Sequence, residues 1–187
     1  MVKSRSLSKV AAMTLREQIE TAFVRRPRPS KLVELREPVT PEQRDALWFA
    51  GRHWRDVGWQ AWQIHPDAFY AFVPEAFTFY LPSVLIAALD APKGQLQAAD
   101  ALLGMLDRAP EVCHWDAFIT QRLLGLEAAE YEATKAWVLA RSGMPGPLDE
   151  DSLTRAYETV DLLAHETARI RNLLRTSSTQ GDTDENA

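Results

Sequence analysis

Apolar residues recur along the chain at intervals of three and four, which is the spacing of one face of an α-helix. Sustained alternation of apolar and polar residues, which is typical of strands, is absent, and no Asn-Gly or Asp-Gly pair marks a hairpin turn. The pattern therefore predicts an all-α fold. The expected helices cover residues 14–26, 40–54, 67–89, 94–107, 126–141 and 149–175.

Short motifs indicate two helix starts and one interruption. Thr14 and Glu17 have the spacing of a capping box, in which each side chain accepts a hydrogen bond from a backbone N–H. Thr40 followed by Pro41 indicates a second start, with threonine as the cap and proline in the first turn. Pro82 lies inside the region 67–89, which is expected to hold the next helices. Because proline removes a backbone hydrogen bond, we expect a bend or a break there.

The last expected helix is the longest. At about 25 residues it would span nearly 40 Å, which is more than a domain of this size needs for its own core. Either it lies across the other helices, or its exposed end binds a second copy of the chain or another protein. Its heptad-like apolar stripe consists of Leu153, Ala156, Tyr157, Val160, Leu163, Ala164, Thr167, Ile170 and Leu174.

Length and composition indicate one domain, because 187 residues with 46% hydrophobic content can bury one core. We expect a disordered basic arm over 1–12, a single compact helical domain over 13–175 and a disordered acidic tail over 176–187. A single cysteine excludes an internal disulfide and fits a cytoplasmic location. No apolar run reaches about 18 residues, so the sequence predicts no membrane-spanning helix.

Charge is uneven along the chain. Residues 1–36 hold nine Lys or Arg and three Glu, a balance of +6 against −5 for the whole chain, so the remainder carries −11. Proteins that bind nucleic acid usually have a net basic domain with a recognisable motif, and neither is present. The sequence thus argues against a nucleic-acid partner, whereas the acidic body favours a basic protein partner.

Two motifs in the centre of the chain, F-x-G-x-x-W and PEAF-x-x-YLP, are separated by some twenty residues. Their members here are Phe49, Gly51, Trp54, Pro74, Glu75, Ala76, Phe77, Tyr80, Leu81 and Pro82. This combination resembles an uncharacterised bacterial family, a domain of unknown function, over a region that extends from the first helix to about Arg141. The resemblance implies a bacterial protein with a helical fold and implies no activity.

Eleven of the seventeen Phe, Trp and Tyr residues lie between Trp48 and Tyr80. We expect this aromatic block to form the folding core, because burying a large aromatic side chain contributes on the order of 2–3 kcal/mol. The alternative is a groove or pocket within the block that receives a partner or a small ligand. The candidate binding residues for that alternative are His53, Trp59, Trp62, Glu75 and Tyr80.

No portable catalytic signature is present. The chain has no phosphate-binding glycine loop and no G-x-S-x-G motif, and its four histidines lack the spacing of a metal site. Glu75 is expected to interact with the positive start of a helix, and Cys113 is expected to be a buried structural thiol. We therefore predict no catalytic residue, no metal and no cofactor.

The sequence favours a non-catalytic protein-binding module of the bacterial cytoplasm. Its last helix is the candidate for forming a homodimer, and neutralisation of a basic toxin or nuclease is one form that such binding could take. The alternative is a small-ligand-binding protein or enzyme with a pocket in the aromatic block.

Overall fold

The computed structural model describes residues 13–144 and 148–181, with side chains as far as residue 176. The arm expected over 1–12 and residues 182–187 of the expected tail lie outside these ranges. The α-helices are α1 (Leu15–Ala22), α2 (Pro41–Trp48), α3 (Trp59–Ile64), α4 (Ala68–Ala71), α5 (Pro74–Asp90), α6 (Gln97–Leu106), α7 (Ala117–Leu123), α8 (Ala128–Arg141) and α9 (Glu150–Gly181). The short 3-10 helices are η1 (Trp54–Asp56), η2 (Pro92–Gly94) and η3 (Val112–His114).

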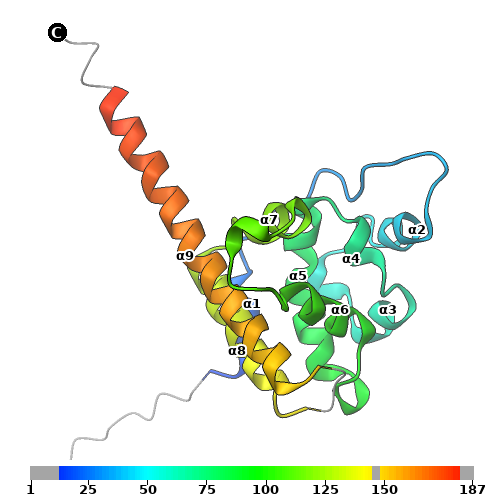
Figure 1. The fold of residues 1–187 in the computed structure, drawn as a ribbon. Coiled ribbons are helices and arrows are strands. Elements are labelled where there is room, and N and C mark those ends of the chain that lie inside the picture. Colours follow the sequence, from blue (N-terminus) through cyan, green and yellow to red (C-terminus); the bar gives the residue numbers. More distant parts are fainter. Residues whose placement is uncertain (1–12, 145–147, 182–187) are drawn as a thin grey trace, which may run out of the picture.

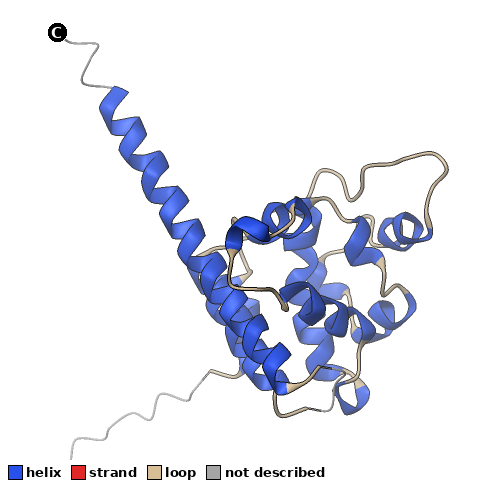
Figure 2. Cartoon of the chain, in the orientation of Figure 1, coloured by secondary structure: helices blue, strands red, loops and turns tan. Residues whose placement is uncertain are grey.

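The expected all-α fold is confirmed, since the described residues contain no strand beyond one isolated bridge between Val33 and Phe72 (Figure 2). Helix α5 runs through the middle of the body and contacts α1, α3, α6 and α7 (Figure 1). On one side of the body α8 packs between α1 and α9, and on the other side α2 packs against α4.

The aromatic block forms the core, as expected. Eight of its eleven aromatic side chains are buried: Phe49, Trp54, Trp62, Phe69, Phe72, Phe77, Phe79 and Tyr80. Phe49 is at the centre of the cluster, with its ring centroid 4.6 Å from that of Trp62 and 5.2 Å from that of Tyr80. These distances are typical of favourable aromatic pairs. The core joins segments that are far apart in sequence, which positions α2, α3 and α5 relative to one another.

Both predicted helix starts are confirmed. Thr14 and Glu17 form the capping box of α1, and Thr40 caps α2 with Pro41 in its first turn. Gln43 completes the second box, because its side chain accepts from the backbone N–H of Thr40 at 3.1 Å. The first helix ends at Ala22, four residues before its predicted end.

Of the bend or break expected at Pro82, the break is wrong, because α5 continues from Pro74 to Asp90 as one helix. Proline in a helix interior costs about 3 kcal/mol. Here the flanking residues Leu81, Ser83, Val84 and Leu85 are all buried, and eleven of the seventeen residues of α5 are buried in total. Tertiary packing of this helix therefore outweighs the local cost of the proline.

The structure also corrects the end of the last helix. Residues 176–181, which the sequence analysis assigns to a disordered tail, continue α9 to Gly181. Polar residues without proline can extend a helix that is already formed, because each added residue contributes one backbone hydrogen bond. The first glycine of this helix is its final residue.

Candidate protein-binding surface

Helix α9 is attached to α8 along an antiparallel seam. Ala156, Val160 and Leu163 are buried in this seam. Farther along, the hydroxyl groups of Tyr131 and Thr167 lie 2.7 Å apart in the interior. These contacts confirm that the first part of the predicted apolar stripe belongs to the core of the domain.

The most C-terminal of these attachments is made by Arg171. Its guanidinium donates to both carboxylate oxygens of Glu127, at 3.0 and 2.9 Å, and to the carbonyl of Leu126 at 3.2 Å. This set of bonds holds α9 to the start of α8. Beyond Arg171 the helix continues for ten residues.

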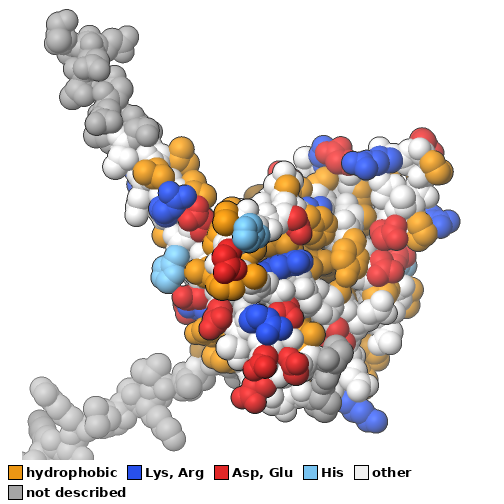
Figure 3. Space-filling model, in the orientation of Figure 1, with side chains coloured by type: hydrophobic (Ala, Val, Ile, Leu, Met, Phe, Trp, Pro, Cys, Tyr) orange, Lys and Arg blue, Asp and Glu red, His pale blue; other side chains and the backbone are white. Residues whose placement is uncertain are grey.

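Those ten residues, 172–181, form a projecting end that leaves the body (Figure 1). At 1.5 Å per residue the projecting end is about 15 Å long. Its apolar side chains face solvent: Leu173 is 54% exposed and Leu174 is 65% exposed. Apolar side chains are visible where α9 leaves the body (Figure 3). The apolar stripe of α9 thus extends to Leu174, three residues past the attachment at Arg171.

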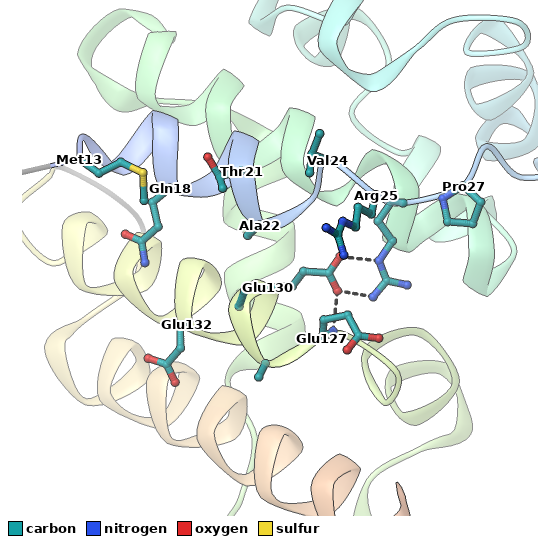
Figure 4. A pocket seen from close by; sticks show the side chains of 13 residues that line it. Met13, Gln18, Thr21, Ala22, Val24, Arg25, Pro27, Glu127, Glu130 and Glu132 are labelled. Carbon is teal, nitrogen blue, oxygen red and sulfur yellow. Dashed lines mark hydrogen bonds and ion pairs between the residues drawn. The ribbon is translucent and has the colours of Figure 1, made fainter.

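A groove of about 860 Å³ lies between α1 and α8 (Figure 4). Its apolar lining includes Met13 and Val24, which are 56% and 52% exposed. Its charged lining includes Arg25, Glu127 and Glu132. The groove is open and mixed in character, as the surfaces that proteins use to bind one another often are.

A buried ion pair joins the two walls of this groove. Arg26 Nε donates to Glu130 Oε1 at 2.6 Å, and Arg26 Nη2 bonds to the other oxygen of the same carboxylate (Figure 4). Glu130 is 2% exposed and also accepts from the backbone N–H of Glu127 at 2.6 Å. Because each group is satisfied by the other, we regard this pair as structural rather than as a recognition element.

One end of the groove lies close to the base of the projecting end. Glu127 lines the groove and is also the partner of Arg171 on α9, the residue just before the projecting end. We therefore treat these two neighbouring features together as the candidate protein-binding surface. Sequence reasoning missed the groove, although Glu127 and Glu130 have the three-residue spacing of a capping box, which is the signal that marks this helix start.

Two of the five predicted site residues are core residues. Trp62 is fully buried, and its indole Nε1 donates to Ser83 Oγ at 3.1 Å. Tyr80 is 1% exposed, and its hydroxyl lies 2.8 Å from the carbonyl oxygens of both Phe49 and Arg52. Neither side chain lines the groove between α1 and α8 or the clefts at Leu153, Arg122 and Arg55.

The other three predicted site residues lie nearer the surface and do not converge. His53 caps η1, because its Nδ1 accepts from the backbone N–H of Arg55 at 3.1 Å, and partial burial lowers its pKa. Trp59 is half-buried against the core. Glu75 is exposed in the first turn of α5, as expected for a carboxylate at a helix start. The structure therefore does not assemble the pocket that the alternative interpretation requires from these five residues.

Replacing Tyr80 by phenylalanine should lower the free energy of unfolding by about 1–2 kcal/mol at neutral pH, because the carbonyls of Phe49 and Arg52 lose the hydroxyl donor that they share. Burial raises the pKa of Tyr80 to about 12 from 10.0. The unfolded state then ionises first, so Tyr80 makes the wild type lose stability as pH rises from 10 towards 12. In urea titrations, the difference in unfolding free energy between the wild type and Y80F should become about 1 kcal/mol smaller by pH 11. A gap that stays constant to pH 11 would contradict this assignment.

The expected role of Cys113 as a buried thiol is wrong, because this residue is exposed. Cys113 lies in η3, just before α7. Helix α7 was not among the helices predicted from the sequence. The carboxylate of Asp116 accepts a hydrogen bond from the backbone N–H of Ile119 at 2.9 Å and so caps the start of α7. Among the described residues, no three His, Cys, Asp or Glu side chains are placed to hold a metal ion.

Comparison with protein-family models, curated proteins and solved structures finds no match to this chain. The resemblance of its two central motifs to a bacterial family consequently stays a prediction. No helix among the described residues combines the length and the apolar character needed to cross a membrane.

Proposed function

We propose that this chain is a non-catalytic protein-binding module that pairs with a second copy of itself through the projecting end of α9. The observation that carries this proposal is the continuation of the apolar stripe of α9 past its attachment at Arg171, with Leu173 and Leu174 more than half exposed. Apolar residues at intervals of three and four are typical of a helix that packs against another helix.

The adjoining groove gives the partner a second contact area. Stable interfaces bury about 1,200–2,000 Å² in total, and two paired ends of ten residues would bury less than this. The groove between α1 and α8 opens beside the base of the projecting end, at Glu127. A partner that packs on the projecting end can therefore also contact the end of the groove at Glu127 (Figure 4).

Light-scattering chromatography tests this proposal with the double variant L173Q/L174Q. We expect the wild type to elute as a dimer at tens of micromolar and the variant as a monomer. At concentrations where both proteins are monomeric, the variant should unfold with a free energy within about 0.5 kcal/mol of the wild type, because both residues are exposed.

The matched control is I64Q, because Ile64 is 69% exposed at the end of α3, on a different element from α9. This control should remain dimeric. A wild type that is monomeric at every concentration would overturn the proposal, and so would a dimer that both variants leave intact.

A further inference from the structure

A second cleft, independent of the α9 surface, lies where α2, α4, the start of α5 and the end of α7 approach one another. Its volume is about 580 Å³. One wall is formed by Tyr70, Val73 and Pro74 of the aromatic block, and Arg122 of α7 also lines the cleft. None of the five residues that the sequence analysis selected lies in its lining.

Arg122 is held rigidly at this cleft. Its guanidinium lies over the ring of Phe118, with Cζ 3.7 Å from the ring centroid. Nη2 donates to the carbonyl of Phe72 at 2.6 Å, and Nη1 donates to the carbonyl of Phe118 at 3.2 Å. Each terminal nitrogen of a guanidinium carries two N–H groups, so one on each remains after these bonds. A fixed pair of donors of this kind matches the two oxygens of a carboxylate.

The positive charge of Arg122 is not compensated by the described part of the protein. No carboxylate of a described residue pairs with it, and its buried Nε has no hydrogen-bond partner there. Burial lowers the pKa of Arg122, and Asp116, which opposes this shift, has the smaller effect. That carboxylate is already bonded to the start of α7. Arg122 is partly buried, and opposite charges attract more strongly there than in bulk water, so an anionic ligand in the cleft would be stabilising.

The other residues that line the cleft determine which class of anion it favours. Glu34, Glu42 and Arg36 also border the cleft, and together with Arg122 their formal charges sum to zero, so the lining suits a singly charged carboxylate better than a doubly charged phosphate. The apolar wall of Tyr70, Val73 and Pro74 offers contact to a carbon skeleton. We propose that the cleft at Arg122 binds a small organic acid, with its carboxylate on the guanidinium and its apolar part against Tyr70.

Calorimetric titration at constant ionic strength tests this site with sodium benzoate as the probe. The wild type should bind benzoate saturably. Variant R122Q should bind it roughly tenfold more weakly or worse, because a charge-assisted hydrogen bond is lost. Benzamide, which has the same shape without the charge, should not bind saturably.

The matched control is R52Q. Arg52 also lies over an aromatic ring, 3.9 Å from the centroid of Trp48, and donates to a backbone carbonyl, but it does not line the cleft. Its variant should bind benzoate as the wild type does. The proposal is overturned if benzoate does not bind the wild type, or if R122Q binds it equally well. Tighter binding of phosphate than of benzoate through Arg122 would also overturn it, by assigning the cleft to inorganic anions.

A second variant keeps the proposal testable if R122Q does not fold, as far-ultraviolet circular dichroism would show. Tyr70 is 45% exposed, so Y70A should fold. Loss of its ring removes part of the apolar wall and should weaken benzoate binding several-fold. Unchanged affinity in Y70A would contradict the proposed placement of the ligand.

Discussion

Variant W62A is expected to lose about 3–5 kcal/mol of unfolding free energy, which is the range for removing a large aromatic side chain from a core. Trp62 is fully buried, and its ring centroid lies 4.6 Å from that of Phe49 and 4.9 Å from that of Phe69. The variant would also leave Ser83 without its indole donor. Urea unfolding followed by circular dichroism measures the change.

Trp59 provides the matched comparison, because it is one turn earlier on the same helix and only half-buried. We expect W59A to cost about 1 kcal/mol, since less apolar area returns to water. Variant W62F retains most of the packing and should fall between the two. Similar losses for W59A and W62A would show that Trp62 is not the core residue described here. Trp62 would then again be a candidate residue for contacting a ligand or partner.

Variant E130A is expected to lose about 3 kcal/mol, because breaking a buried ion pair leaves the other charge without compensation. Glu130 is 2% exposed, and its partner Arg26 is 17% exposed. The change also removes the acceptor of the Glu127 backbone N–H at the start of α8. Chemical unfolding of R26A, E130A and the double variant R26A/E130A measures the coupling free energy between the two residues.

Glu132 is the control on the same helix. It pairs with Lys135 at 2.8 Å but is 63% exposed, so E132A should change stability by less than about 0.5 kcal/mol. The double variant should cost less than the sum of R26A and E130A, because the two residues share one interaction. If the losses of R26A and E130A simply add, there is no coupling free energy between Arg26 and Glu130, and the ion pair does not help to hold the two groove walls together.

Short-range features were predictable from the sequence. The capping box of Thr14 and Glu17 and the start at Thr40 depend on hydrogen bonds between residues three apart, so a few neighbouring letters are sufficient to recognise them. The aromatic core was also predictable, because the density of large apolar side chains between Trp48 and Tyr80 leaves few alternatives to burial.

Features that depend on distant residues were not predictable in this way. Arg26 and Glu130 are 104 positions apart, and no local pattern links them. Arg122 is positioned by a hydrogen bond to the carbonyl of Phe72, fifty positions earlier, and no sequence pattern indicated that its charge would lack an ion-pair partner. Individual site residues depend on such long-range contacts more than the fold class does.

The helical fold class, several helix starts and the aromatic core block follow from the amino-acid sequence alone, because backbone hydrogen bonding and apolar spacing are local properties. Tertiary structure decided that α5 passes through Pro82, that Trp62 and Tyr80 lie inside, and that residues 172–181 project from the body. The reason is physical: burial and charge compensation are properties of the assembled set of helices. A stripe of apolar residues specifies a contact face without specifying which neighbour covers it.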